Sequence, residues 1–274
     1  MSRLALSLPL LMSLACGSKS ESTGDESSST TGDGTSTSTG ATTTTSADGS
    51  SSTSSTSEAA DTTETGPVTL SISGEVSDFF EMGPIGYAQI SLLDEKGSET
   101  VANPDGTYVI EDLEPNSFHR ILLAENANYW GAIVPVQLED ESIDKYDLSQ
   151  VSTAVIDLQE AALQDQNPDV LVDEDAAVLL IAINQNTATG ATVTLDPPPA
   201  ENTYYAPDAN GAPILNSNLI EWGLFPVAVF FNLPPGDAGT YTVTVTHPDR
   251  ECTALDPEPP TRGRHVNLIY VDCV

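Results

Sequence analysis

The sequence predicts an all-β protein in which two β-sandwich modules are joined by a short helix and follow a disordered Ser/Thr-rich stalk. Three observations predict this. Short stretches of alternating apolar and polar residues recur from residue 68 onward, as the strands of a sandwich do. Between about residues 147 and 166 the apolar residues follow the period of a helix instead. Residues 17–66 contain almost no apolar side chains.

The stalk is predicted from composition. Residues 17–66 are almost wholly Ser, Thr, Gly, Asp and Glu, and their only apolar side chains are four alanines. Such a segment buries too little apolar surface to offset the entropy of the chain. We therefore expect residues 16–66 to form a disordered linker, with a root-mean-square span of roughly 40 Å.

The charge of the chain is strongly unbalanced. It contains 41 Asp and Glu against 8 Lys and Arg, so its formal net charge is −33. No basic stripe exists that could neutralise a phosphate backbone, and we expect no nucleic-acid partner. The acidic surface is instead expected to keep the protein soluble and to repel other copies.

The N-terminus has the pattern of an export signal. Arg3 is followed by a mostly apolar run over residues 4–14, which is too short to cross a bilayer. The run ends in Ser13-Leu14-Ala15-Cys16-Gly17, which resembles the cleavage site of bacterial lipoproteins, although Leu14 is one place nearer the cysteine than usual. That resemblance implies a signal peptide over residues 1–15 and a lipid anchor on Cys16. The alternative is an ordinary secreted protein with an unmodified cysteine.

If Cys16 is lipidated, the chain belongs to the cell envelope. Gly17 gives no retention signal, so we expect the outer membrane, with exposure at the cell surface. The membrane would then be one partner, through the lipid.

The first module is predicted over residues 67–141. Leu70, Ile72 and Val76 alternate with small or polar residues, and Asn103-Pro104-Asp105-Gly106 is a turn signal. Trp130 fits the alternation of a later strand as a core residue. Pro135 lies at an outward position of the same strand and predicts a sheet edge there.

A helical bridge is predicted over residues 142–169. Asp147 is expected to cap the start of the helix, and Asn167-Pro168 to end it. The second module is predicted over residues 170–274, with a long polar loop over residues 197–218 that follows three prolines.

Several motifs resemble the carboxypeptidase regulatory-like domain. They are Gly74-Glu75-Val76, residues 86–90 and residues 105–115 in the first module, and a weaker match over residues 231–241 in the second. The resemblance implies a transthyretin-like or Ig-like β-sandwich. It also implies that the modules are non-catalytic, because domains of this family lack the zinc ligands of the peptidase for which they are named.

The two modules also resemble one another. The pattern of residues 88–92 recurs at residues 191–195, an offset of 103, and that of residues 110–115 recurs at residues 230–235, an offset of 120. These matches indicate an internal repeat, and chance similarity is the alternative.

Cys252 and Cys273 remain after Cys16 is assigned. In an exported chain, two remaining cysteines predict one disulfide, worth on the order of 3 kcal/mol for a loop of this length. Free thiols or metal ligands are the alternative.

The sequence shows no convincing catalytic residues, resident metal or cofactor. The alternative is a metal-dependent, dioxygenase-like enzyme that uses His247 and His265 with nearby Tyr204, Tyr205 or Tyr241, or another extracytoplasmic enzyme. A serine hydrolase would need its serine on a strained elbow such as Gly-x-Ser-x-Gly, which the modules lack. Acidic runs near residues 139–144 and 173–175 could hold Ca²⁺, but they lack EF-hand spacing.

Binding is therefore the expected role, with an unknown extracellular or envelope protein or a glycan as the second partner. Loops on a rigid sandwich commonly carry recognition. Within and after the 197–218 loop, Tyr204, Tyr205 and Trp222 are the candidate ligand contacts.

Overall fold

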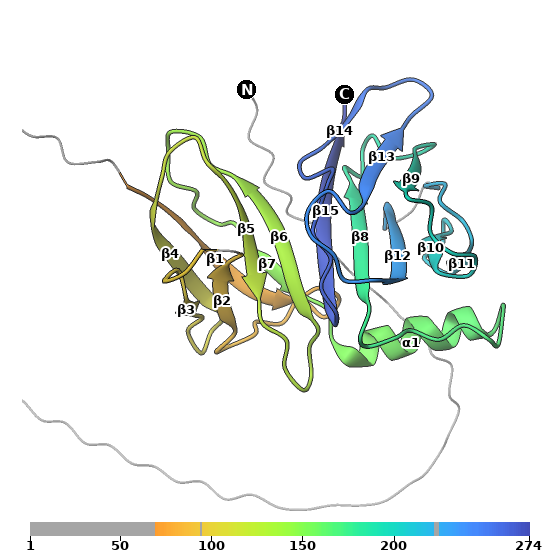
Figure 1. The fold of residues 1–274 in the computed structure, drawn as a ribbon, viewed down its shortest axis with the longest axis horizontal. Helices are drawn as coiled ribbons and strands as arrows, with labels where there is room; N and C mark the ends of the chain where they lie inside the picture. The colour runs from red at the N-terminus through yellow and green to blue at the C-terminus, as the bar shows by residue number, and fades with distance from the viewer. Residues whose placement is uncertain (1–68, 94, 222–224) are drawn as a thin grey trace, which may run out of the picture. The chain divides into compact units, whose positions relative to one another are not determined.

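The computed structural model describes residues 69–93, 95–221 and 225–274, and it is mostly β with one short helix (Figure 1). The predicted fold class is therefore confirmed. No helix among the described residues has the length and apolar character needed to cross a membrane. The elements are β1 (Leu70–Asp78), β2 (Gln89–Leu92), β3 (Thr100–Val101), β4 (Thr107–Leu113), β5 (Phe118–Leu123), β6 (Gly131–Gln137), β7 (Leu148–Gln150), α1 (Thr153–Gln164), β8 (Ala177–Ile183), β9 (Thr192–Asp196), β10 (Tyr204–Pro207), β11 (Pro213–Leu215), β12 (Val227–Leu233), β13 (Thr242–Thr246), β14 (Cys252–Ala254) and β15 (His265–Cys273).

One sheet runs through both halves of the described chain. It has ten strands, in the order β11-β10-β12-β8-β15-β6-β5-β2-β3, and β14 pairs with β15 outside this path. A three-stranded sheet, β4-β1-β7, and a two-stranded sheet, β13-β9, accompany it. Figure 1 shows β6, β15, β8 and β12 side by side, so the last strand of the chain joins the two halves.

The halves also share a hydrophobic core. Val178 and Leu180 of β8 belong to the cluster that contains Ile72 and Leu123, whereas Leu179 and Ile181 belong to a second cluster. β8 and β15 pair in parallel and are buried on both faces. This double burial explains why both strands are nearly continuous apolar runs instead of alternating ones.

The division at residues 142–169 stays a prediction. Residues 67–274 form one compact unit, in which the sheet and the first core cluster continue from one side of the predicted bridge to the other.

The helix begins later than predicted. α1 starts at Thr153, and the N-cap residue Ser152 makes no capping bond with its side chain. Asp147 does not cap the helix; its carboxylate accepts a hydrogen bond from the backbone N–H of Glu75 at 3.1 Å. Residues 148–150 instead form β7, which pairs in parallel with β1. Tertiary pairing with β1 therefore overrides the helical spacing of the apolar residues.

The predicted loop over residues 197–218 was also wrong. β10 and β11 form a hairpin there, and β10 pairs with β12, so the hairpin extends the large sheet. The outer edge of β11 is covered by one side chain. Gln166 donates to the carbonyl of Pro213 at 2.6 Å and accepts from the N–H of Leu215 at 3.0 Å. This amide makes two of the hydrogen bonds that a neighbouring strand would make, and it thereby protects the edge of the sheet from pairing with another strand.

Pro135 lies in an interior strand, contrary to the edge prediction. β6 lies between β15 and β5 in the sheet. The pairing with β15 ends at Ile133, however, and from there Pro135 pairs only with β5. The proline therefore occupies the part of β6 where a missing N–H costs no hydrogen bond to β15.

Both predicted halves contain the same strand pairs. β1 pairs with β4 as β8 pairs with β12, and β2 pairs with β5 as β9 pairs with β13. β4 and β12 each carry one extra residue before Leu113 and Leu233, where Asp112 and Asn232 have φ of 61° and 58°. Matching bulges at the sequence offset of 120 support the internal repeat.

Candidate functional site

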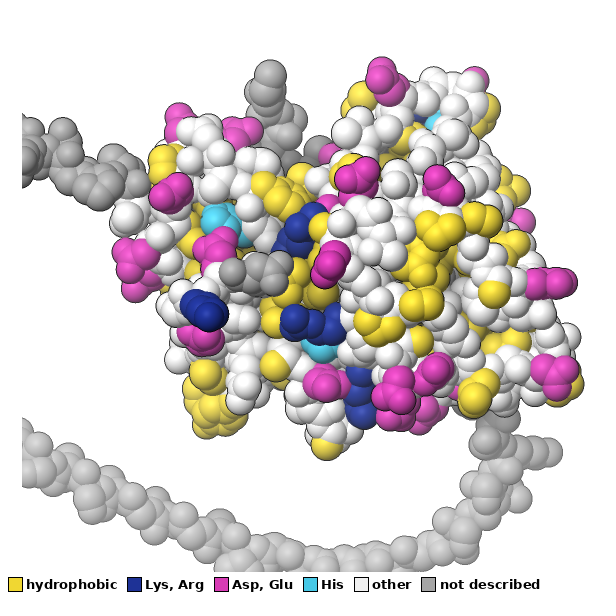
Figure 2. Space-filling model, viewed as in Figure 1, with side chains coloured by type: hydrophobic (Ala, Val, Ile, Leu, Met, Phe, Trp, Pro, Cys, Tyr) yellow, Lys and Arg dark blue, Asp and Glu magenta, His cyan; other side chains and the backbone are white. Residues whose placement is uncertain are grey.

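Two neighbouring arginines lie beside the start of the pairing between β15 and β6, a place that we call the seam. Arg262 and Arg264 flank Gly263, just before the start of β15. Arg262 is exposed and lines one depression, whereas Arg264 lines another. In Figure 2, dark blue side chains gather near the centre of the face, on either side of a yellow apolar strip. This gathering is notable in a chain with a net charge of −33.

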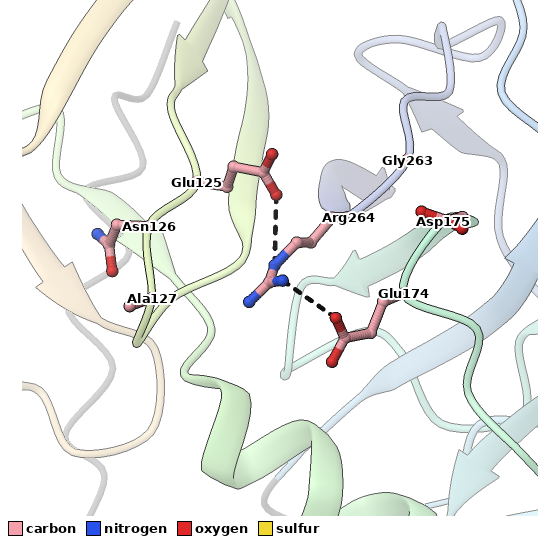
Figure 3. Close-up of a pocket in the computed structure, with 7 residues that line it drawn as sticks. All are labelled: Glu125, Asn126, Ala127, Glu174, Asp175, Gly263 and Arg264. Carbon is pink, nitrogen blue, oxygen red and sulfur yellow. Dashed lines mark hydrogen bonds and ion pairs between the residues drawn. The ribbon is translucent and has the colours of Figure 1, made fainter.

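The Arg264 pocket is polar and has a volume of about 510 Å³. Figure 3 shows the guanidinium between two carboxylates from opposite sides of the pocket. Its Nε lies 3.3 Å from Glu125, and its Nη1 donates to Glu174 at 3.0 Å. Both carboxylates are exposed to solvent, so each pair contributes at most about 1 kcal/mol. The contacts orient the arginine and leave little excess positive charge in this pocket.

His265 holds the backbone at this seam. A side-chain carbon on Gly131 would lie only 2.3 Å from Cδ2 and Nε2 of His265, so glycine is required there. The Nδ1–H of His265 donates to the carbonyl of Gly263 at 2.8 Å. Burial lowers the pKa of His265, which keeps the ring neutral. The imidazole is therefore a packed structural group.

The Arg262 groove is the second depression, with a volume of about 730 Å³. Its base comes from β5 and β6, and its opposite wall comes from the segments after β12 and before β15. Its lining residues are Leu93, Arg120, Ile133, Pro235, Gly236, Asp237, Ala238, Pro260, Thr261 and Arg262.

The wall of the groove is held rigidly. Gly236 and Thr261 exchange two backbone hydrogen bonds of 2.9 and 2.8 Å, and the hydroxyl of Thr261 donates to the carbonyl of Pro234. On the base, Arg120 donates to the buried carboxylate of Asp256 through Nε at 2.7 Å and Nη2 at 2.9 Å. Both sides of the groove are thus organised before any ligand arrives.

A Ser–His–Glu chain lies at the start of β5, and no sequence motif indicated it. Nε2 of His119 lies 2.7 Å from Oγ of Ser117, and its Nδ1 lies 2.9 Å from Oε1 of Glu95. The spacing resembles a catalytic triad. However, the hydroxyl of Ser117 already donates to the carbonyl of Glu114 at 2.5 Å.

The hydrogen bonds of the Ser117–His119–Glu95 group indicate a structural role. Because Ser117 has only one hydroxyl hydrogen and donates it to the carbonyl of Glu114, that hydrogen is not directed at Nε2 of His119. A catalytic base needs a bare Nε2 that can take the proton of the serine. The arrangement anchors the β2–β3 loop to β5.

The candidate ligand contacts Tyr204 and Tyr205 lie on β10 and are half-buried. Tyr204 stacks on Phe230 with ring centroids 5.8 Å apart, and Tyr205 lies 6.4 Å from Phe231. Burial raises the pKa of Tyr205. Both rings therefore pack largely against β12, and their role as ligand contacts stays a prediction. Trp222 lies outside the described residues.

Cys252 and Cys273 form a disulfide. They are directly opposed partners on β14 and β15, with Cα atoms 4.0 Å apart. Flanking backbone bonds between Glu251 and Val274 close the same end of the sheet. Cys16, the predicted lipid site, lies outside the described residues.

The residues considered as possible metal ligands do not form a common site among the described residues. His119, His247 and His265 bond to separate partners: Ser117 and Glu95, the carbonyl of Thr189, and the carbonyl of Gly263. Within residues 69–93, 95–221 and 225–274, no three His, Cys, Asp or Glu side chains are grouped so that they could hold a metal ion. Trp130 is buried in the first core cluster, as predicted.

No family model matches the chain, and no curated protein matches it. Among solved structures, the Bacillus anthracis TIE protein is 12% identical, with a TM-score of 0.26, and the alignment covers 75% of this chain and 34% of that one. This chain thus spans about a third of the length of that protein. The minor pilin GBS52 of Streptococcus agalactiae is 10% identical, with a TM-score of 0.23 and coverages of 74% and 95%. A major pilin protein of Streptococcus pyogenes is 9% identical, with a TM-score of 0.22 and coverages of 75% and 96%. These similarities are distant.

Proposed function

We propose that this chain is a membrane-anchored lipoprotein displayed at the cell surface, whose non-catalytic β-sandwich modules serve binding, adhesion or envelope structure. The observation that carries the proposal is the apolar run over residues 4–14 that ends at Ala15-Cys16. The Ser/Thr-rich segment after it would act as a tether that lifts the modules from the lipid.

The disulfide supports an extracytoplasmic location. Disulfides persist in oxidising compartments and are rare where thiols are kept reduced. The Cys252–Cys273 bridge joins opposed residues of two paired strands, as a permanent structural bridge does. It therefore agrees with export of the chain.

The repeated strand pairing supports the finer proposal that each half is a carboxypeptidase regulatory-like sandwich. The motifs that carry this resemblance, residues 105–115 and 231–241, lie on β4 and β12 and in the segments next to them, and each strand has its bulge before the shared Leu-x-Pro. Such modules would present loops and grooves to a partner instead of a catalytic centre.

The test is intact mass spectrometry of the protein purified from its native membrane. The expected mass is that of residues 16–274, carrying a diacylglyceryl group and an acyl group and lacking the two hydrogens of the disulfide. Protease treatment of intact cells should degrade the anchored modules, and Cys16→Ser should abolish the lipid mass. Cleavage at another position without lipid would overturn the anchor. Stoichiometric iron or zinc in the purified protein would favour an enzyme instead.

A further inference from the structure

We propose that the outer edge of β4 binds an extended segment of another protein, which pairs with it as an antiparallel strand. The segment carries a Lys or Arg, an apolar residue and a β-branched residue at three successive positions. The proposal names the kind of partner for the binding role and so rests on the proposed function. It is carried by the unpaired edge, by the repeat of the strand pairs and by the charge around β4.

The outer edge of β4 has no partner strand. β4 lies at one end of the sheet β4-β1-β7 and at the left of Figure 1. The backbone N–H of Val76 on β1 donates to the carbonyl of Gly106, just before β4 begins. Because the hydrogen bonds of an antiparallel pair alternate along each strand, the backbone groups of Val109 and Glu111 point away from β1. No described residue bonds to these groups, and such an edge can accept a further strand.

The second half of the chain shows a strand on the equivalent edge. The counterparts of these two residues on β12, at the sequence offset of 120, are Val229 and Phe231. There β10 pairs antiparallel with β12 at Val229, and the N–H of Phe231 donates to the carbonyl of Thr203 at 2.8 Å. The chain supplies β10 and β11 between β9 and β12, whereas between β2 and β4 it forms only the two-residue β3, which pairs with β2. The first half therefore lacks a covering strand of its own.

The pairing of β10 with β12 sets the register of the incoming segment. The first and third of its three residues lie opposite Glu111 and Val109 and exchange backbone hydrogen bonds with them, and the middle residue lies opposite Ile110. Ile110 is buried, and paired residues point to the same side of a sheet. In the second half, Tyr204 lies opposite Phe230 and stacks on it with ring centroids 5.8 Å apart. The middle residue is therefore apolar.

The exposed face of β4 selects the two outer residues. Val109 is 46% exposed, and a β-branched residue opposite it would pack against it. At the other end, Glu111, Asp112 and Glu114 are exposed, and no described residue forms an ion pair with them. Residues 97–119 contain no Lys or Arg, so a basic residue opposite Glu111 would balance this charge. The net charge of −33 disfavours a second copy of this chain as the occupant.

The contact is short, so the binding is expected to be weak. The carbonyl of Thr107 already accepts a hydrogen bond from the N–H of Asn103 at 2.8 Å, which limits the segment to about three paired residues. We expect a dissociation constant between about 10 µM and 1 mM. Fluorescence anisotropy of the labelled peptide Gly-Ser-Lys-Tyr-Val-Ser-Gly, titrated with the full-length protein in detergent, measures it.

Two N-methylated peptides test the strand geometry. The backbone N–H of the peptide valine points at β4 in the proposed register, so N-methylation of that valine should weaken binding at least about tenfold. The N–H of the neighbouring tyrosine points away from β4, and N-methylation there is the matched control that should leave affinity unchanged. In the protein, amide hydrogen exchange resolved to single residues should slow at Val109 and Glu111 when the peptide binds.

Two protein variants locate the site. Val109→Pro removes an N–H that points away from β1, so it should preserve the β1–β4 pairing and weaken binding about tenfold. Glu111→Gln should weaken binding about two- to fivefold. Its control is Glu201→Gln, which removes an exposed carboxylate of the second half and should have no effect. Thermal unfolding of each variant establishes that it is folded.

Four outcomes would overturn the inference: binding weaker than about 1 mM, equal effects of the two N-methylations, equally tight binding of a scrambled peptide of the same charge, or slowed exchange at amides other than Val109 and Glu111. Sedimentation that reveals a dimer protecting the same two amides would also overturn it, because the occupant would then be a second copy. Each leaves the mass-spectrometric test of the lipid anchor unaffected, so failure here is distinct from failure of the proposed function.

Discussion

Arg120 and Asp256 form a two-point ion pair between segments that are far apart in the sequence. The Nε and Nη2 atoms of the arginine lie 2.7 and 2.9 Å from the two carboxylate oxygens. Arg120 lies on β5, whereas Asp256 lies between β14 and β15 and is only 4% exposed. The pair therefore ties the first half of the sheet to the segment that leads into its central strand.

The first prediction is that Asp256→Asn lowers the free energy of unfolding by about 2–3 kcal/mol, because it removes the charge of the buried carboxylate that accepts two hydrogen bonds from Arg120. Urea unfolding measures the loss. The matched control is Glu174→Gln, which breaks an exposed pair with Arg264 and should cost less than about 1 kcal/mol. Equal losses in the two variants would contradict the special role of the Arg120–Asp256 pair.

The second prediction concerns the disulfide. Replacing Cys252 and Cys273 by serine should lower the free energy of unfolding by about 3 kcal/mol, since the bridge closes a loop with a sequence separation of 21. Thermal unfolding with and without reductant measures this, and reductant should have no effect on the double-serine variant. An unchanged melting temperature after verified reduction would show that the strands of the β14–β15 pair hold without the bridge.

The third prediction is that the halves do not fold separately. A fragment of residues 67–141 loses the β15 partner of β6 and exposes the core face that Val178 and Leu180 cover. Its amide NMR spectrum should be poorly dispersed, whereas residues 67–274 should give a dispersed spectrum. A well-dispersed spectrum from the short fragment would instead establish two independent sandwiches.

The fourth prediction is a loss of stability at alkaline pH. Burial raises the pKa of Tyr270 to about 12, from an ordinary value of 10.0, and also raises the pKa values of Tyr108, Tyr146 and Tyr205. Because the unfolded chain loses these protons first, the stabilisation is complete below pH 10 and decreases as the pH rises from about 10 to 12. Urea unfolding across this range measures the decrease.

Tyr270→Phe should reduce that pH dependence, because it removes one of the ionising groups. Tyr87→Phe is the control, since Tyr87 is 70% exposed and its ring is accessible to water in the folded protein. If Tyr270→Phe left the pH dependence unchanged, Tyr270 would not be one of the groups that produce it.

The fifth prediction is that Ser117 is not an activated nucleophile. Its hydroxyl hydrogen is held by the carbonyl of Glu114, so a fluorophosphonate probe should not label it, while chymotrypsin in the same solution should react. Labelling of Ser117 that disappears in His119→Ala would overturn the structural assignment of the Ser117–His119–Glu95 chain.

Local sequence signals predicted much of the fold but misplaced two segments. Leu148 and Val151 continue the helical spacing toward the N-terminus, yet residues 148–150 pair with β1. Tyr204 and Tyr205 follow a proline-rich stretch that indicates a loop, yet they pair with β12. In both cases the partner strand lies far away in the sequence, and a local pattern carries no information about it.

The candidate site was less accessible to prediction. Tyr204, Tyr205 and Trp222 were selected because of their residue type and loop setting. The Arg262 groove instead combines residues that are more than a hundred positions apart, such as Ile133 and Pro235, which only strand pairing brings together. The excess of acidic residues was the one available signal, because it makes each arginine of the modules conspicuous.

The sequence by itself determined the β class of the protein, a helix after the first set of strands and the pairing of Cys252 with Cys273, whereas the anchor at Cys16 stays a prediction. These features follow from periodicity, composition and the number of cysteines, none of which depends on which distant strands pair. The tertiary structure alone decided that β15 lies between β6 and β8, that the first core cluster draws residues from both halves and that Arg120 meets Asp256. Those features depend on which distant strands exchange backbone hydrogen bonds, and that choice follows from burial of the whole chain.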